Sequence, residues 1–543
     1  MIRRLFQASS QSITSAAVII GAAAFASRIL GVLRDRILAG EFGAGTTLDI
    51  YYAAFRIPDF LYNLLILGAL SAGFIPVFVQ YWKKGERPAW ELATGVLELV
   101  VASLAIIGAL GWIFAPQLVP WITPGFGADQ QDLTVALTRV MFLSPLLLGI
   151  SAVWGGVLQS LKKFFVFSLA PIFYNIGIMI GALWFVDWWG PVGLAWGVVL
   201  GAGLHMLVQL PAVLAAGYRP MWLRPLGHAG VRQILWLMVP RTLGLAATQF
   251  NVIAMTVIAS TLAVGSIAIF QLANNLQGVI LGIFGVSFAI AAFPSLATAW
   301  ADHRPGEFVR TFSVTVRQVL FLVVPLSVVF MVLRAQITRA VLGAGQFDWA
   351  DTIAVADALA LFAVSLFAQS LIPLLARAFF ALHDTWTPFL IGLGGAAVNI
   401  ALAVFLVNHA ITIGTMNIGG VTGLAAAFSV ASLLQMGLLW VALHFRVGGL
   451  DEGRIVFAAL KISLAAVVLG IVVQALKFLI APYTGTTTFV GVFSQGVIAG
   501  LGGCLAFVAA SFVMRSEELL TIIASVRRRL LKKEAVVALE EEL

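Results

Sequence analysis

Apolar runs of about 20 residues alternate with short polar connections along the whole chain. A helix of that length crosses the roughly 30 Å of hydrocarbon in a bilayer. The pattern therefore predicts an all-α polytopic membrane protein with about fourteen transmembrane helices. The expected spans lie near residues 13–37, 50–81, 92–115, 133–160, 165–187, 192–216, 233–263, 267–300, 308–334, 352–381, 386–409, 417–445, 456–480 and 488–514.

Lysines and arginines gather in alternate connections. Lys83, Lys84 and Arg87 lie in one such connection, whereas "VDWWGPV" and "APYTGTTTFVG" on the other side contain no basic residue. The positive-inside rule therefore places both termini in the cytoplasm, which requires an even number of spans. Arg334 and Arg339 are exceptions that the pattern does not explain.

The two halves of the chain resemble each other. Pro76 and Trp82 recur as Pro294 and Trp300 at one constant separation, and "GLAWGVVLGAGLHM" later matches "GLAAAFSVASLLQM". Both segments of each matched pair are expected to cross the membrane in the same direction. This predicts two pseudo-symmetric six-helix lobes with the substrate path between them. The expected parts are an N-terminal lobe at 1–218 with helices 1–6, a C-terminal lobe at 219–447 with helices 7–12, helices 13 and 14 at 448–514, and a basic cytoplasmic tail at 515–543. Within the tail, segment 525–543 is predicted to form an amphipathic helix on anionic lipid.

Composition excludes several classes of function. Hydrophobic residues make up 61% of the 543 residues and charged residues only 10%. The single cysteine, Cys504, excludes a disulfide framework, and the six histidines show no metal-binding spacing. There is no GxxxxGK[ST] loop and no connection long enough for a catalytic domain. The net charge of +8 is spread between apolar runs, which fits loops near anionic lipid better than nucleic acid. We expect a non-enzymatic transporter without a metal or cofactor.

The first two expected helices carry charges at bilayer depth: Arg28, Arg34, Asp35, Asp49 and Arg56. Each such charge costs at least about 2.5 kcal/mol unless it faces a partner or a water-filled cavity. Arg28 and Asp35 are one heptad apart and share a helix face. These charges predict a polar chamber with net positive charge. In the alternative interpretation, Arg34–Glu41 is an outer loop and Arg56 lies near a membrane interface.

Expected helices 7 and 8 contain further polar residues. Arg241, directly behind Pro240, either extends to the cytoplasmic headgroups or faces the same chamber. The neutral amides of these helices, Asn275 among them, either line a polar path or bond helix to helix.

Specific motifs mark expected helices 1, 2 and 8. They are "SRILGVLRD", "FGAGTTLD", "AFRIP", a small-residue stretch that ends in "FIP", and "ANNLQGVILGIFGVSFAIAAFPSLA". With these motifs the chain resembles the MurJ/MviN lipid II flippases, which belong to the multidrug/oligosaccharidyl-lipid/polysaccharide exporter superfamily. The resemblance covers nearly the whole chain.

The resemblance implies that the chain moves lipid II, a polyprenyl-diphosphate-linked disaccharide peptide, from the inner to the outer leaflet of the bacterial cytoplasmic membrane. It implies a cavity where arginines bind the diphosphate, and a groove of helices 13 and 14 for the lipid tail. The implied partners are lipid II, membrane lipids and cell-wall synthesis proteins. The expected substrate-binding residues are Arg28, Arg34, Asp35, Asp49, Arg56, Arg241 and Asn275.

The chain departs from the family pattern at several positions, among them Leu67, where the family has a glutamate. Family arginines are replaced by Tyr62, Asn63 and Asn275, and the helix-7 and helix-11 carboxylates of a family sodium site are missing. Our hypothesis is that Arg56 and Arg241 supply the missing positive charge.

Other functions stay open at this stage. The chain is alternatively a flippase for another polyprenyl-diphosphate oligosaccharide, or a non-transporting membrane scaffold of cell-wall synthesis. A multidrug exporter fits less well, because cationic substrates usually need buried acids. A membrane glycosyltransferase would need a catalytic loop.

Overall fold

The computed structural model describes residues 13–67, 73–219, 221, 227–413, 416–484, 488–521 and 523–524. The amphipathic helix predicted for 525–543 lies outside the described residues.

The first half of the chain forms α-helices joined by short connections, and π-helical turns interrupt some of them. The elements are α2 (Ile13–Phe42), α3 (Thr46–Ala54), α4 (Arg56–Tyr62), η1 (Asn63–Leu67), α5 (Ile75–Lys84), α6 (Glu86–Ile122), α7 (Ala128–Met141), α8 (Leu143–Ser160), α9 (Phe164–Ile180), η3 (Gly181–Phe185), α10 (Val186–Trp189), α11 (Val192–Leu207) and α12 (Leu210–Leu214).

The second half is also helical, apart from one short antiparallel hairpin that the sequence pattern did not indicate. The elements are α13 (Ala229–Ser260), α14 (Ser266–Ile280), η5 (Leu281–Gly285), α15 (Val286–Ala301), α16 (Pro305–Val332), α17 (Arg334–Leu342), α18 (Trp349–Val364), α19 (Leu366–Ala381), α20 (Trp386–Asn408), β1 (Ile411–Ile413), β2 (Met416–Ile418), α21 (Gly420–Val447), α22 (Glu452–Thr484) and α23 (Phe489–Val513).

Each expected span coincides with helical segments, which confirms the prediction of a polytopic helical membrane protein. Among the described residues, ten helices are long and apolar enough to cross a membrane, or eleven if α18 and α19 form one span across their 48° bend. The spans expected at 13–37, 50–81 and 233–263 are not among them, so the count of fourteen stays a prediction.

Prolines explain two of the breaks within the expected spans. Pro58 and Pro145 lie in the first turns of α4 and α8, where a missing N–H is tolerated. Pro58 cannot donate to the carbonyl of Ala54, and the hydroxyl of Thr138 donates to that oxygen instead, at 3.4 Å. The break therefore ties α3 to α7.

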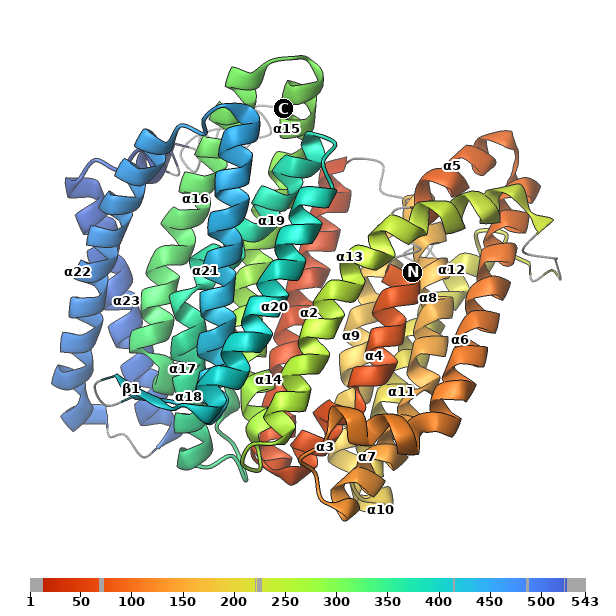
Figure 1. Ribbon diagram of the computed structural model, residues 1–543, viewed down its shortest axis with the longest axis horizontal. Helices are drawn as coiled ribbons and strands as arrows, with labels where there is room; N and C mark the ends of the chain where they lie inside the picture. Colours follow the sequence, from red (N-terminus) through yellow and green to blue (C-terminus); the bar gives the residue numbers. More distant parts are fainter. Residues whose placement is uncertain are drawn as a thin grey trace, which may run out of the picture.

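The helices form two groups, with α2, α13 and α14 between them (Figure 1). One group holds α4 to α12 and the other holds α15 to α23. Each group has its own apolar core, and α13 contributes Val231 and Ile234 to the core of the first group. Further along, α13 bonds to the second group, because Asn399 on α20 donates to Asn251 at 2.8 Å. The long helix α13 therefore links the two groups.

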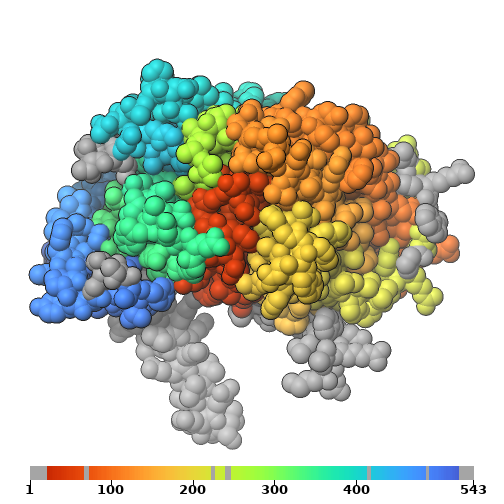
Figure 2. Space-filling view, turned by 90° about the horizontal axis from the view of Figure 1, so that it is seen from below, coloured from red at the N-terminus to blue at the C-terminus, as the bar shows by residue number. Residues whose placement is uncertain are grey.

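The connections fall at two ends of the molecule. The basic connections, such as those around Lys84, Arg304 and Arg454, lie at the upper end in Figure 1, which we call the basic end. At the opposite end a third apolar core joins both groups, because it contains Leu137 and Leu194 of the first group and Leu342 and Leu359 of the second. Figure 2 shows the end of α2 in red, filling the space between the green and the orange segments. The two groups are thus packed together at the opposite end.

Candidate functional site

A chain of polar side chains runs across the middle of the molecule between the two groups. Arg34 on α2 donates to Oδ1 of Asp35 through Nε at 3.0 Å and Nη2 at 2.7 Å. Its Nη1 donates to the Asn175 amide oxygen on α9 at 3.2 Å. The guanidinium therefore joins α2 to the first group through one charged and one neutral partner.

The same carboxylate continues the chain into the second half of the sequence. Oδ2 of Asp35 accepts a hydrogen bond from Asn275 on α14 at 3.0 Å. Asn275 in turn accepts from Gln271 at 2.8 Å, and Gln271 accepts from Nη2 of Arg56 at 2.8 Å. Nε of Arg56 donates to the hydroxyl of Thr256 on α13 at 2.7 Å. We call this set the polar bridge; its members are Asn175, Arg34, Asp35, Asn275, Gln271, Arg56 and Thr256.

The polar bridge carries two positive charges and one negative charge. Asp35 neutralises Arg34, and both side chains are largely buried, with relative exposures of 24% and 9%. Arg56 bonds only to neutral groups in the bridge, and within the described part of the chain no carboxylate lies within 4 Å of its guanidinium. A guanidinium has five N–H donors, so Arg56 keeps donors for an anion.

Arg28 lies nearer the basic end and joins the same two helices. Its Nη1 donates to the carbonyl of Val279 on α14 at 3.1 Å. The two terminal nitrogens of the guanidinium lie against Gly282, where an added Cβ would stand 2.1 Å from Nη1 and 2.2 Å from Nη2. A larger side chain at position 282 would therefore displace the arginine from this place.

Asp49 lies at the opposite end, beside the start of α14. Its two carboxylate oxygens accept hydrogen bonds from the backbone N–H groups of Gly265 at 2.6 Å and Ala268 at 2.8 Å. These donors belong to the first turn of α14, whose N–H groups have no partner within the helix. The carboxylate caps α14 from α3 and thereby fastens the first half of the chain to the second.

The predicted residues thus divide by position. The structure brings Arg34, Asp35, Arg56 and Asn275 together in the polar bridge and places Arg28 and Asp49 on either side of it. The backbone of residue 241 lies in α13, but the Arg241 side chain is outside the described part, so its predicted role stays untested.

Sequence reasoning missed Asn175, Thr256 and Arg36. Arg36 donates to the carbonyls of Ala340 at 2.8 Å, Val341 at 3.1 Å and Gly343 at 3.1 Å. These carbonyls end α17, so the guanidinium caps that helix from α2. A basic residue in the last turn of a helix indicates a cap when it belongs to that helix. Arg36 belongs to α2 and caps α17, so the sequence around α17 does not reveal this cap.

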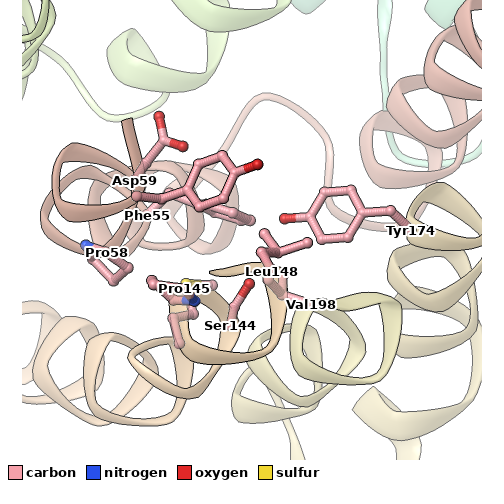
Figure 3. Close-up of a pocket in the computed structure, with 10 residues that line it drawn as sticks. Phe55, Pro58, Asp59, Ser144, Pro145, Leu148, Tyr174 and Val198 are labelled. Atoms are coloured by element: carbon pink, nitrogen blue, oxygen red, sulfur yellow. The ribbon is translucent and has the colours of Figure 1, made fainter. Parts of the chain in front are cut away.

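A small cavity of about 20 Å³ lies beside the polar bridge in the first group. Figure 3 shows the hydroxyls of Ser144 and Tyr174 directed into it, with Asp59 on its rim. Tyr62, one of the positions where family arginines are replaced, also lines it. The space suits about one water molecule.

Solved structures show which class of fold this is. A structure described as lipid II flippase MurJ in an inward closed conformation aligns with a TM-score of 0.76 at 22% identity, covering 92% of this chain and 98% of that one. An inward-facing multidrug resistance MATE family transporter of the MOP superfamily aligns with a TM-score of 0.65 at 14% identity, covering 78% and 96%. The chain therefore shares its fold with these two transporters.

Sequence comparison identifies the family within that class. The profile of the family described as lipid II flippase MurJ matches residues 38–526. A probable lipid II flippase MurJ of Vibrio cholerae is 31% identical over 456 residues, which cover 80% of this chain and 84% of that protein. Lipid II flippase MurJ of Burkholderia cenocepacia is 30% identical, with 77% and 81% covered. The chain belongs to the MurJ lipid II flippase family.

Proposed function

We propose that the chain moves lipid II from the inner to the outer leaflet of the bacterial cytoplasmic membrane by alternating access. Family membership supports the substrate, and the polar bridge is the observation that carries the mechanism. The basic end would face the cytoplasm, as the positive-inside rule requires.

The two-lobe division supports this mechanism. We assign 1–218 and 219–447 to the lobes, with α13 spanning the gap between them, and 448–514 to the tail-binding helices. Phe457 and Leu464 on α22 and Leu505 on α23 expose large apolar side chains, which suit contact with a polyprenyl chain.

The diphosphate of lipid II would bind between Arg34 and Arg56. Arg56 has spare donors, and Arg34 would exchange Asp35 for phosphate oxygens of similar geometry. Once Asp35 loses Arg34, its hydrogen bond to Asn275 no longer belongs to a neutralised pair. The freed carboxylate would be repelled by the bound diphosphate. This repulsion would strain the contact between α2 and α14 and so couple binding to movement of the lobes.

Because the opposite end is packed, this conformation would be the one that binds substrate from the cytoplasmic side. Asp49 and Arg36 hold that end together through α14 and α17. The diphosphate would then enter from the basic end, past Arg28. Opening toward the outer leaflet would require both of these caps to break.

Complementation tests the proposal. Bacteria depleted of their own flippase would receive the wild-type chain, Arg34→Ala or Arg87→Ala, and lipid II at the outer surface would be measured by accessibility. Arg87 is exposed in a basic connection and serves as the matched control. We expect the wild type and Arg87→Ala to restore growth and exposed lipid II, and Arg34→Ala to restore neither. Growth restored without exposed lipid II would instead indicate another role, such as a scaffold.

A further inference from the structure

A second, larger cavity lies far from the polar bridge. It has a volume of about 480 Å³. Its walls are the end of α16 and the start of α17, together with α18 and α22. Its polar lining consists of Arg334, Gln336, Asp357, Gln474 and Lys477. We call it the α22 pocket.

The α22 pocket has an excess of positive charge. Nε of Arg334 pairs with Asp357 at 3.2 Å, while Nζ of Lys477 donates to the backbone carbonyl of Val332 at 2.8 Å. In the described part of the chain, Lys477 has no carboxylate within 4 Å. An ammonium has three donors and a guanidinium five, so both cations keep donors for a further ligand.

The wall of the pocket is held in place by a hydrogen-bonded relay. Gln336 on α17 donates to Gln495 on α23 at 2.9 Å, and Gln495 donates to the backbone carbonyl of Lys477 at 3.0 Å. Gln495 is buried. Three helices therefore fix the position from which the lysine extends.

The surroundings of the pocket are those of a lipid-facing surface. Ile471 and Phe478 on α22 are 64% and 72% exposed, and Ile353 on α18 is also exposed. Asp357 lies about two turns, or roughly 12 Å, inside the end of α18, and Lys477 lies at a similar depth in α22. The pocket thus opens about two turns inside the helix ends, at the opposite end of the molecule from the basic connections, where we expect hydrocarbon to meet the headgroups.

We propose that the α22 pocket binds the phosphate of an anionic membrane lipid in the leaflet at the opposite end. A phosphate accepts hydrogen bonds from both an ammonium and a guanidinium and balances the excess charge. The apolar side chains beside the pocket accommodate the lipid's hydrocarbon chains. This second lipid site, separate from the polar bridge, also explains why Arg334 departs from the positive-inside pattern. The proposal does not depend on the transported substrate.

Native mass spectrometry of the purified full-length protein tests the proposal. The protein would be titrated with phosphatidylglycerol, a polyprenyl monophosphate, phosphatidylcholine or inorganic phosphate. We expect the two anionic lipids to bind about tenfold more tightly than phosphatidylcholine, because a net negative charge faces unpaired donors. The tighter of the two anionic lipids identifies the natural source of the phosphate. Equal affinity for phosphatidylcholine, or binding of inorganic phosphate alone, would overturn the proposal.

Variants locate the binding. Lys477→Gln should weaken phosphatidylglycerol binding about tenfold and Lys477→Arg should retain it, because charge attracts the phosphate. Gln474→Glu changes an exposed residue of the lining and should weaken lipid binding, because the new carboxylate repels the phosphate. It tests whether lipid binds in the pocket even if Lys477→Gln fails to fold. Lys461→Gln, on the same helix and about 24 Å away, is the control and should bind normally. Unchanged binding in Gln474→Glu would rule the pocket out.

Discussion

The carboxylate of Asp35 and the amide of Asn275 lie 3.0 Å apart, although 240 positions separate them in the chain. The contact joins α2 to α14, and the same carboxylate neutralises Arg34. A ligand that competes for Arg34 therefore acts directly on a contact between the two halves. This relationship is the physical basis of the proposed coupling between binding and movement.

Arg34 should be indispensable for transport. We expect Arg34→Ala to abolish flipping at a normal protein level, and Arg34→Lys to retain part of the activity, because a lysine loses the bidentate phosphate geometry. Measuring lipid II accessibility alongside membrane protein content checks both points. Full activity in the alanine variant would contradict a substrate role for this arginine.

Asn275→Ala should loosen the contact between α2 and α14. The variant loses one charge-assisted and one neutral hydrogen bond, together about 2–4 kcal/mol before compensation. Spin labels at the exposed positions Trp121 and Val264 would report the separation of the halves at the opposite end. We expect a longer or broader distance distribution than in the wild type.

Asn408→Ala is the control for that measurement. Asn408 is exposed, and among the described residues its side chain bonds only to the carbonyl of Val404 within its own helix. Its removal should leave the distance distribution unchanged. If Asn275→Ala matches this control, the polar bridge does not hold the halves together.

Arg241 stays the candidate for the missing family charge. We predict that Arg241→Ala is as damaging as Arg34→Ala, and that a second substitution, Asn275→Arg, partly restores flipping. The position of Asn275 against Asp35 gives the new arginine a carboxylate partner and a place beside Arg34. An active Arg241→Ala protein would refute the compensation.

Asp49→Ala should destabilise the protein at the opposite end. The substitution leaves two N–H groups at the start of α14 without partners, at a cost of about 1–3 kcal/mol for each. Thermal unfolding of the purified protein should show a lower midpoint. Asp129→Ala, in the exposed first turn of α7, should unfold near the wild-type temperature. Equal midpoints for the two variants would mean that the cap contributes nothing.

The sequence predicts the helices well because apolar length is a local property. Prolines give a weaker signal: α4 and α8 begin close to Pro58 and Pro145, whereas Pro171 lies inside a continuous helix. The bend at Ser365 has no such signal. There the hydroxyl of Ser365 bonds to Ser429 at 2.9 Å, a contact that only the folded chain creates.

The candidate site is predictable only in part. Arg34 and Asp35 stand out because charges are expensive in a membrane. Asn175 and Thr256 do not, since a single neutral polar residue in an apolar run serves equally well to pack one helix against another. Asp49 caps α14 by binding N–H groups that lie more than 200 positions further along the chain. The spacing of residues around Asp49 therefore does not reveal this role.

Transport by the purified protein in lipid vesicles tests the central claim most directly. Lipid II would be placed in one leaflet, and its arrival in the other leaflet would be followed for the wild type, Arg34→Ala and Arg87→Ala. We predict that lipid II crosses with the wild type and Arg87→Ala and remains in its original leaflet with Arg34→Ala. Crossing at the wild-type rate with Arg34→Ala, or no crossing with a folded wild-type protein, would contradict the account.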